Sequence, residues 1–197
     1  MFDQIVQEIE RQGFYTRPQV LSLQDLLLAN DFFLNHMTEF NPAQVGLNAD
    51  RKRLENIRGD LTFWLDSDQP PGEFIHPFAF LNELKAHLNK KLFLGLRDFE
   101  AHLAVYPPGS FYAKHRDRHK TKSTRVLSFV FYLNQEWNDD DGGELVLYDD
   151  KNNELLKVLP LPGTFICFLS EDFPHEVKPA KKERKSLTGW IHSTHLS

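Results

Sequence analysis

Three residues in two distant segments have the chemistry to bind one metal ion. His115 and Asp117 are two positions apart, so both side chains leave the same face of an extended strand. His175 comes much later and can join them only if the chain folds back. Two imidazoles and one carboxylate on one side of an ion leave other coordination positions open, as in non-heme iron(II) oxygenases. Because the chain contains nine histidines, the triple alone could arise by chance.

The segment after His175 strengthens this interpretation. Arg184, Ser186, Thr188 and Trp190 share one strand phase, while the residues between them take the opposite phase. A guanidinium therefore points the same way as two hydroxyls and an indole. Since guanidinium binds carboxylate in a bidentate fashion, this face predicts a pocket for a small carboxylate.

Short motifs extend the pattern over residues 57–190. They are IRGD at 57–60, YPPG at 106–109, HRD at 115–117, YLN at 132–134, GGEL at 142–145, PHEVKPA at 174–180 and R-x-S-x-T-x-W at 184–190. Together they resemble the iron(II)- and 2-oxoglutarate-dependent prolyl hydroxylases. The closer branch is that of the hypoxia-inducible-factor prolyl hydroxylases and their bacterial relatives. Residues 1–56 match less clearly.

The resemblance implies a reaction and its cofactors. His115, Asp117 and His175 would hold iron(II), and 2-oxoglutarate would chelate it through its 1-carboxylate and 2-keto oxygens. Dioxygen would take the remaining position, and ascorbate would act as reductant. The implied reaction converts 2-oxoglutarate to succinate and CO2 while hydroxylating a prolyl residue of a protein. No catalytic residue beyond the metal centre is required.

Two neighbouring cations compete for the distal carboxylate of 2-oxoglutarate. The resemblance implies Arg184, supported by the hydroxyls of Tyr132 and Thr188. Lys185 is the rival, because it has the spacing from His175 that the collagen-type prolyl hydroxylases use for their lysine. The strand phase favours Arg184 over Lys185.

The same resemblance suggests residues that bind the substrate. Arg125, Trp190 and Tyr112 would supply an aromatic wall and a cation. Residues 41–73 form a long charged segment, where the resembling enzymes carry a mobile strand-loop that closes over the peptide. Arg58 and Asp60 would lie at the base of this loop; the alternative is an ordinary surface hairpin.

The hydrophobic pattern predicts helices first and strands later. We expect helices over residues 2–12, ended by Gly13, over about 19–37 and over 77–95. From residue 99 the chain changes to short alternating segments, which indicate a β-sandwich or jelly roll. Expected strands are 99–107, 111–117, 125–134, 143–149, 154–160, 163–170, 175–180 and 185–193. The predicted class is mainly β with supporting helices (α+β), with a double-stranded β-helix, or jelly-roll, core.

Composition bounds the organisation of the chain. With 197 residues, 41% of them hydrophobic, it can bury one substantial core, so we expect a single domain over 1–197. Residues 1–95 would form a helical layer and the mobile strand-loop, and 96–197 the jelly roll. The lone Cys167 excludes an internal disulfide. Without a signal-like or membrane-length apolar run, we expect a cytoplasmic protein that binds no membrane.

Charge leaves two interpretations open. The net charge of -5 gives no general case for nucleic acid as a partner. The basic residues beside the two metal segments form either a solvated rim or a positive approach to the site. They are Lys114, Arg116, Arg118, Lys120, Lys122, Arg125, Lys178, Lys181, Lys182, Arg184 and Lys185.

Three functions remain in competition at this point. The first is a protein prolyl hydroxylase, for which the bacterial relatives suggest elongation factor Tu as the substrate. The second keeps the oxygenase chemistry but acts on a free amino acid or an alkylated nucleobase. The third is a metal-binding interaction module without catalysis.

Overall fold

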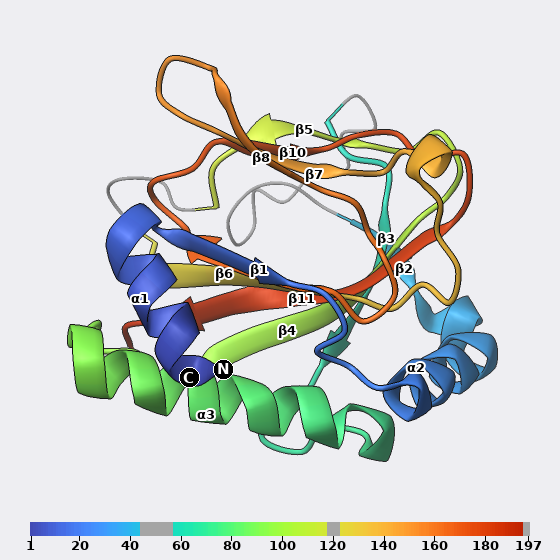
Figure 1. Cartoon of the computed structure of the whole chain (residues 1–197). Helices are drawn as coiled ribbons and strands as arrows, with labels where there is room; N and C mark the ends of the chain where they lie inside the picture. Colours follow the sequence, from blue (N-terminus) through green and yellow to red (C-terminus); the bar gives the residue numbers. More distant parts are fainter. Residues whose placement is uncertain (44–56, 118–122, 195–197) are drawn as a thin grey trace.

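Two antiparallel sheets face each other, and helices cover the outer side of the larger one (Figure 1). The computed structural model describes residues 1–43, 57–117 and 123–194, and every structural statement below refers to these ranges. The α-helices are α1 (Phe2–Gln12), α2 (Leu23–His36) and α3 (Ile75–Leu92), with short 3-10 turns at Met37–Glu39, Gly72–Phe74 and Asp139–Asp141.

The strands divide into a major and a minor sheet. The major sheet has the order β1-β9-β6-β11-β4-β3-β2, and the minor sheet has the order β5-β10-β7-β8. The strands are β1 (Phe14–Arg17), β2 (Asn41–Pro42), β3 (Leu61–Leu65), β4 (Phe99–Tyr106), β5 (Tyr112–His115), β6 (Arg125–Tyr132), β7 (Leu145–Tyr148), β8 (Glu154–Val158), β9 (Phe165–Leu169), β10 (His175–Val177) and β11 (Arg184–His192). This arrangement is the predicted jelly roll with helices.

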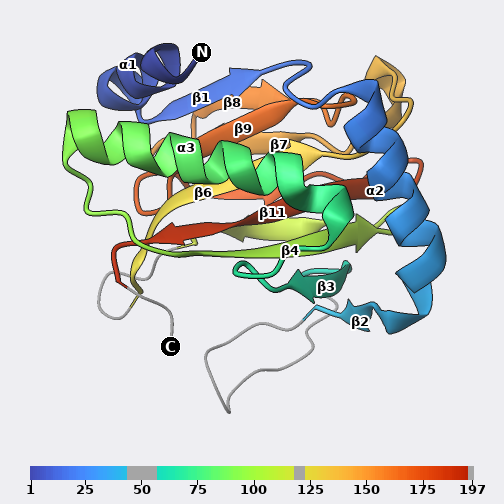
Figure 2. The ribbon, with the colours of Figure 1, turned by 90° about the horizontal axis from the view of Figure 1, so that it is seen from below.

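Each face of the major sheet packs against a different layer. On one face, Leu187 and Ile191 of β11 join the hydrophobic cluster formed with the helices, of which α1 and α3 lie across the sheet (Figure 2). On the other face, Val130 and Tyr132 of β6 join a second cluster between the two sheets. Strand alternation thus sends apolar residues toward the helices and leaves the polar residues of β11 facing the space between the sheets.

The predicted elements are found, with shifted ends. α1 ends at Gly13 as expected, because Gly13 adopts a left-handed φ of 81°. α2 begins at Leu23 instead of residue 19, because Ser22 and Asp25 form a capping box. α3 begins at Ile75, which places Pro77 in the first turn, and ends before Phe93 instead of at Gly95.

All eight strands expected from residue 99 onward are present. β1 was missed, and β2 and β3 lie in the segment 41–73, where a strand-loop or a hairpin was expected without strand bounds. β1, β2 and β3 belong to the major sheet, so residues 1–95 contribute strands as well as helices. The expected loop over the substrate spans residues 41–73, of which 44–56 lie outside the described residues, as do Arg118, Lys120 and Lys122. Within the described ranges, no helix combines the length and the apolar character that crossing a membrane requires.

Gly189 lies at the centre of β11, where the neighbouring chain leaves no room for a side chain. A Cβ atom there would stand 1.9 Å from the carbonyl oxygen of Glu100 and 2.8 Å from the ring of Phe129. We expect Gly189→Ala to lower the free energy of unfolding by about 1–3 kcal/mol, since β4 must move away from β11. Urea denaturation measures this loss.

Gly72→Ala is the matched control for this substitution. A Cβ at Gly72 would meet nothing within 4 Å, so its denaturation midpoint should stay near that of the parent protein. Equal stability of the two variants would contradict the close approach of β4 and β11.

Candidate metal centre and its cavity

The pairing of β10 with β5 brings the three predicted ligands together. His175 opens β10 and pairs directly with His115, the last residue of β5. One ligand atom from each of His115, Asp117 and His175 lies within 4.8 Å of the others. Oδ1 of Asp117 lies 3.5 Å from Nε2 of His115, and Oδ2 of Asp117 lies 3.4 Å from Nε2 of His175. The donors thus converge on one point, as a metal ion requires.

Backbone carbonyls fix both imidazoles. Nδ1 of His115 lies 2.8 Å from the carbonyl oxygen of Ala113, and Nδ1 of His175 lies 3.0 Å from that of Phe173. Since a carbonyl can only accept, each Nδ1 carries the proton and donates it. Each Nε2 is therefore left with a free lone pair directed at Asp117, the arrangement of metal-binding histidines.

The carboxylate is held in the same way. Oδ2 of Asp117 accepts a hydrogen bond of 2.7 Å from Ser128, whose hydroxyl also lies 2.8 Å from that of Ser170. Burial opposes ionisation of Asp117, but His175, His115 and Ser128 together hold its pKa well below the usual range.

Burial also keeps the second imidazole neutral. It lowers the pKa of His175 to about 4, although Asp117 acts in the opposite direction. A neutral imidazole beside an ionised carboxylate is the protonation state that metal binding needs. The residues present therefore fit a divalent ion such as iron(II), with one face of the ion left open.

A cavity between the two sheets runs from this cluster to Arg184. Arg184, at the first position of β11, is only 2% exposed. Its Nε donates to the carbonyl of Gly143 at 2.9 Å, and its Nη1 lies 3.5 Å from Oγ of Ser186. Within the described part of the chain, Arg184 has no ion pair with a carboxylate, so its charge is buried without a counterion.

Tyr132 places a buried hydroxyl without a hydrogen bond among the described residues beside this cation. Its ring packs against the guanidinium of Arg184 at 4.9 Å. Burial raises the pKa of Tyr132, although Arg184 opposes this, so the hydroxyl stays protonated and available as a donor. Because a buried cation and a buried donor without partners are both costly, this end of the cavity is suited to an anion.

The predicted phase of β11 is confirmed. Arg184, Ser186, Thr188 and Trp190 all line the cavity. Lys185 points to the other face, where its ammonium pairs with Glu183 at 3.1 Å and lies 5.0 Å from the ring of Phe33. Lys185 therefore cannot reach an anion beside Arg184.

Thr188 was expected to donate a hydrogen bond to the carboxylate, and the structure gives its proton another acceptor. Its Oγ1 donates to the carbonyl of Phe129 at 2.9 Å. The hydroxyl beside Arg184 is instead that of Ser186, which accepts from the guanidinium and can still donate its own proton.

Asp60 was expected at the substrate, but the structure buries it. Its side chain is fully shielded and accepts both arms of Arg58, at 2.7 and 2.5 Å. Arg58 lines the cavity and lies 4.3 Å above the ring of Tyr112, which in turn stacks on His115 at 3.6 Å. Asp60 thus holds Arg58, and through it Tyr112, and does not contact the cavity itself.

Arg125 is not part of the cavity lining, but it lies against the ring of Trp190. Its guanidinium stacks on the indole at 3.4 Å and pairs with Glu100 at 2.8 Å. Arg125 opens β6 in the same phase as Leu127, which packs in the cluster formed with the helices. The register of β6 against β11 shifts beside Arg125, where it pairs with His192, and this irregularity places it beside Trp190.

Sequence reasoning missed several residues of the lining. Tyr106 and His102 of β4 face the cavity, as does Ser128. The alternation of FEAHLAVY contained the signal, since His102 and Tyr106 share a strand phase. Burial raises the pKa of Tyr106, so it is a neutral hydroxyl near Arg184.

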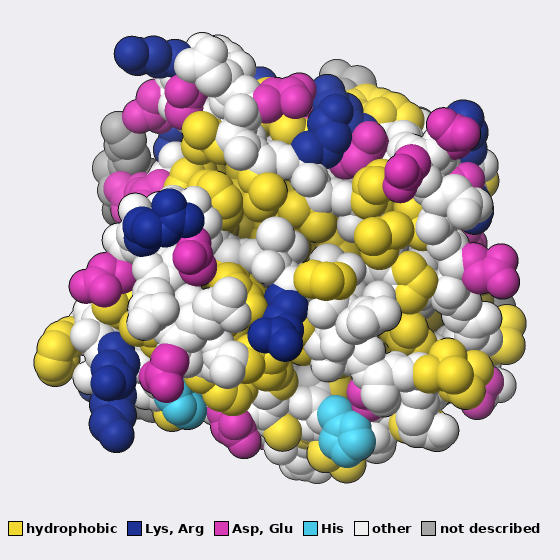
Figure 3. Space-filling view, in the orientation of Figure 1, with side chains coloured by type: hydrophobic (Ala, Val, Ile, Leu, Met, Phe, Trp, Pro, Cys, Tyr) yellow, Lys and Arg dark blue, Asp and Glu magenta, His cyan; other side chains and the backbone are white. Residues whose placement is uncertain are grey.

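The described lysines near the site are mostly paired with acids. Lys178 pairs with Glu176 at 2.9 Å and Lys182 with Asp141 at 2.8 Å, in addition to the pair at Lys185. On the face shown in Figure 3, side chains of both charges are interspersed with hydrophobic ones. These pairs favour a solvated rim over a strongly positive approach.

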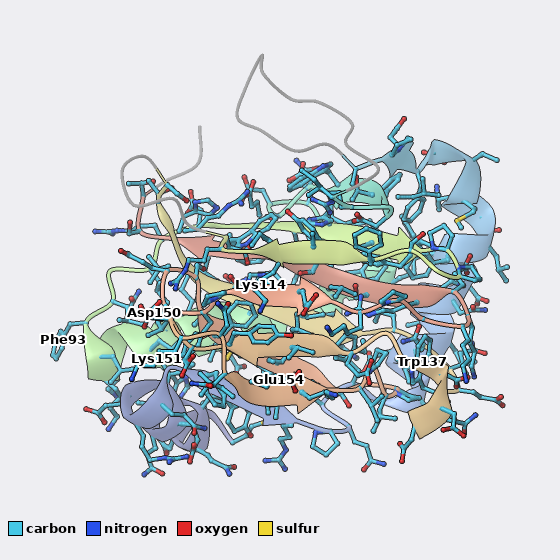
Figure 4. The ribbon with its side chains drawn as sticks, turned by 90° about the horizontal axis from the view of Figure 1, so that it is seen from above. Phe93, Lys114, Trp137, Asp150, Lys151 and Glu154 are labelled. Atoms are coloured by element: carbon cyan, nitrogen blue, oxygen red, sulfur yellow. The ribbon has the colours of Figure 1, made fainter. Side chains whose placement is uncertain are left out.

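Arg116 connects the two ligand-bearing segments from outside the cavity. Its Nη1 donates at 2.5 Å to the carbonyl of Glu171, four residues before His175. Its Nη2 binds Asp150, which lies at the turn between β7 and β8 (Figure 4). Arg116 stands between His115 and Asp117, so this single side chain ties the first ligand segment to the second.

Comparison with known proteins gives matches over most of the chain. The model of the 2OG-Fe(II) oxygenase superfamily matches residues 101–192. Egl nine homolog 1 of Homo sapiens is 29% identical over 142 residues, which are 69% of this chain and 33% of that protein. The chain therefore spans about a third of the length of this curated relative.

Solved structures match over nearly the whole chain. A prolyl-4-hydroxylase of Pseudomonas putida has a TM-score of 0.85 and 36% identity, covering 99% of this chain and 100% of that one. A prolyl hydroxylase of Trichoplax adhaerens, in complex with a peptide fragment of the hypoxia inducible factor oxygen degradation domain, has a TM-score of 0.85 and 27% identity. This second match covers 98% of this chain and 89% of the Trichoplax adhaerens chain.

The bridge made by Arg116 should contribute to metal affinity. We expect Arg116→Ala to weaken iron(II) binding about 10–100-fold, because residues that orient metal ligands typically have effects of this size. Anaerobic calorimetry with iron(II) measures the affinity directly.

Lys114→Ala is the control for Arg116→Ala. Lys114 neighbours His115, but its ammonium packs on the ring of Tyr148 and donates to Asn152 at 3.4 Å, whereas Arg116 binds the carbonyl of Glu171. Its removal should leave the iron(II) affinity unchanged. An Arg116→Ala protein that binds iron(II) as tightly as the Lys114→Ala protein would disprove the role of the bridge.

Proposed function

The chain belongs to the 2OG-Fe(II) oxygenase superfamily, and from this we propose that it is a prolyl 4-hydroxylase that acts on a protein. Two of its similar structures are prolyl hydroxylases by name. The observation that carries the proposal is the cavity itself: a His-Asp-His cluster at one end faces a buried guanidinium without a counterion at the other.

The two ends of the cavity suit the two cofactors of the family. His115, Asp117 and His175 would hold iron(II). Arg184, assisted by Tyr132, would bind the distal carboxylate of 2-oxoglutarate. Bound iron(II) would supply the oxidation, in which 2-oxoglutarate and dioxygen give succinate, CO2 and one oxygen atom for the substrate. Ascorbate would serve as reductant.

The protein's own contribution is placement and shielding. The carbonyls of Ala113 and Phe173 orient the imidazoles, and Ser128 orients the carboxylate. Tyr132 and Arg184 are almost fully buried, so water is excluded where the co-substrate carboxylate would lie. No described side chain needs to act as a general base in such a reaction.

The substrate would bind at the aromatic end of the cavity. Tyr112 and Trp190 line it, and Trp64 stands nearby with half of its surface exposed. An aromatic wall of this kind suits the compact, apolar pyrrolidine ring of proline. As the specific substrate we propose elongation factor Tu, which would place the reaction in the cytoplasm.

We further propose that residues 1–197 act as one domain. The major sheet joins β1, β2 and β3 from the first half of the chain to strands from the second half. Neither half of the chain contains all the strands of this sheet.

The activity test supplies iron(II), ascorbate, 2-oxoglutarate and purified elongation factor Tu. We expect succinate to form only with the protein substrate present, and mass spectrometry should find one added oxygen atom on a proline. Succinate formation driven instead by a free amino acid or by nucleic acid would contradict the proposal, as would a lack of turnover with every substrate.

The two neighbouring cations of β11 provide a matched pair of variants. We expect Arg184→Ala to retain iron(II) but to raise the KM for 2-oxoglutarate roughly a hundredfold, since a buried carboxylate without its cation loses about 3 kcal/mol. Lys185→Ala should leave this KM unchanged, because its ammonium lies on the other face. The reverse outcome would assign the carboxylate to Lys185.

His115→Ala tests the metal centre separately. We expect it to abolish iron(II) binding and activity together, because two ligands cannot keep the ion that three hold. Calorimetry and the succinate assay check the two losses. Full activity of this variant would exclude His115 as a ligand.

A further inference from the structure

Two polar atoms at the aromatic end of the cavity have no partner. Nδ1 of His102 and Nε1 of Trp190 are both buried and make no hydrogen bond among the described residues. Both side chains line the cavity, and His102 as a whole is only 3% exposed. Because buried polar groups are almost always hydrogen-bonded, two such atoms in one wall point to a missing partner.

The neighbours of these atoms cannot supply that partner. Thr188 pairs with His102 across β4 and β11, but its hydroxyl is bound to Phe129. Trp64 packs against His102, with ring centres 4.6 Å apart, and lies 6.4 Å from Trp190. The charged side chains nearest to His102 are already paired with one another, Arg58 with Asp60 at 2.5 Å and Arg125 with Glu100 at 2.8 Å.

The imidazole of His102 is neutral. Burial lowers its pKa to about 4, and the positive charge of Arg58 adds to this effect. A neutral imidazole offers one donor and one acceptor, and the indole of Trp190 offers a donor only. With Nδ1 of His102 as the acceptor and the indole as the donor, the complementary ligand carries both an N–H and a carbonyl, as a peptide group does.

We propose that His102 and Trp190 bind the substrate backbone just after the target proline, an inference that rests on the proposed function. Nδ1 of His102 accepts the N–H of the following residue, and Nε1 of Trp190 donates to a neighbouring carbonyl. Proline has no N–H of its own, so the following residue provides the first N–H in that direction. This polar pair would make the site selective for a prolyl group within a chain.

Access to the polar pair requires a side chain to move. Neither atom is reached by solvent in this structure. Trp64 is 48% exposed, whereas His102 is nearly buried, so the indole of Trp64 is the ring with room to turn. Its displacement would expose the polar pair when the substrate enters.

A pair of small probes tests the hydrogen bond without any turnover. N-acetylproline methylamide carries the N–H that follows proline, and N-acetylproline methyl ester lacks it. Binding is followed by NMR with protein loaded with 2-oxoglutarate and zinc, which supports no oxidation. We expect the amide to bind the parent protein about tenfold more tightly than the ester, and His102→Leu to abolish the difference. Equal binding of the two probes to the parent protein, or no binding of either, overturns the proposal.

Thermal stability separates this role from a structural one. His102→Leu removes a buried polar atom without a partner, so we expect its Tm to rise by about 2–4 °C while the preference for the amide is lost. His102→Asn keeps a polar atom at the position of Nδ1 and should retain both the parent Tm and the preference. A lower Tm for His102→Leu with the preference intact would show that His102 serves the fold alone. Since these readouts need no hydroxylation, they stand apart from the activity assay.

Discussion

The short antiparallel pairing of β10 with β5 is the constraint on which the site depends. It sets His175 directly opposite His115, while β7 holds the other edge of β10. Carbonyls within the same segments orient both imidazoles, so backbone pairing and ring orientation come from the same few residues. A register change by one residue would turn the side chain of His175 to the other face of the sheet and dismantle the cluster.

The cavity is built from polar groups that the fold buries but does not satisfy. Within the described chain, Arg184 has hydrogen bonds but no counterion. Tyr132, His102 and Trp190 each carry a buried polar atom without a hydrogen bond among the described residues. Each such group lowers the stability of the empty protein. In contrast, Arg58 and Arg125 are already bound by Asp60 and Glu100, and they serve to hold the aromatic wall. Groups that already have partners thus form the scaffold of the site, and groups without one form its binding surface.

Much of the site could be predicted because strand alternation is local. The phase of β11 separated Arg184 from Lys185, and the motif around His115 and Asp117 placed both on one face. β1, the bounds of β2 and β3, and their place in the major sheet were not predicted, because these strands are short and pair with segments far away in the sequence. Arg125 was expected near Trp190 from the resemblance alone, because the register shift beside Arg125 cannot be read from alternation.

The sequence by itself determined which side chains share a face, since period-two alternation follows from the backbone alone. It also determined that two imidazoles, one carboxylate and one guanidinium were available for a common site. Only the tertiary structure decided which groups already have partners. It gave the proton of Thr188 to Phe129 and the carboxylate of Asp60 to Arg58, and it left Nδ1 of His102 without a hydrogen bond among the described residues. The physical reason is that hydrogen bonds across strands depend on register and packing, which no local pattern encodes.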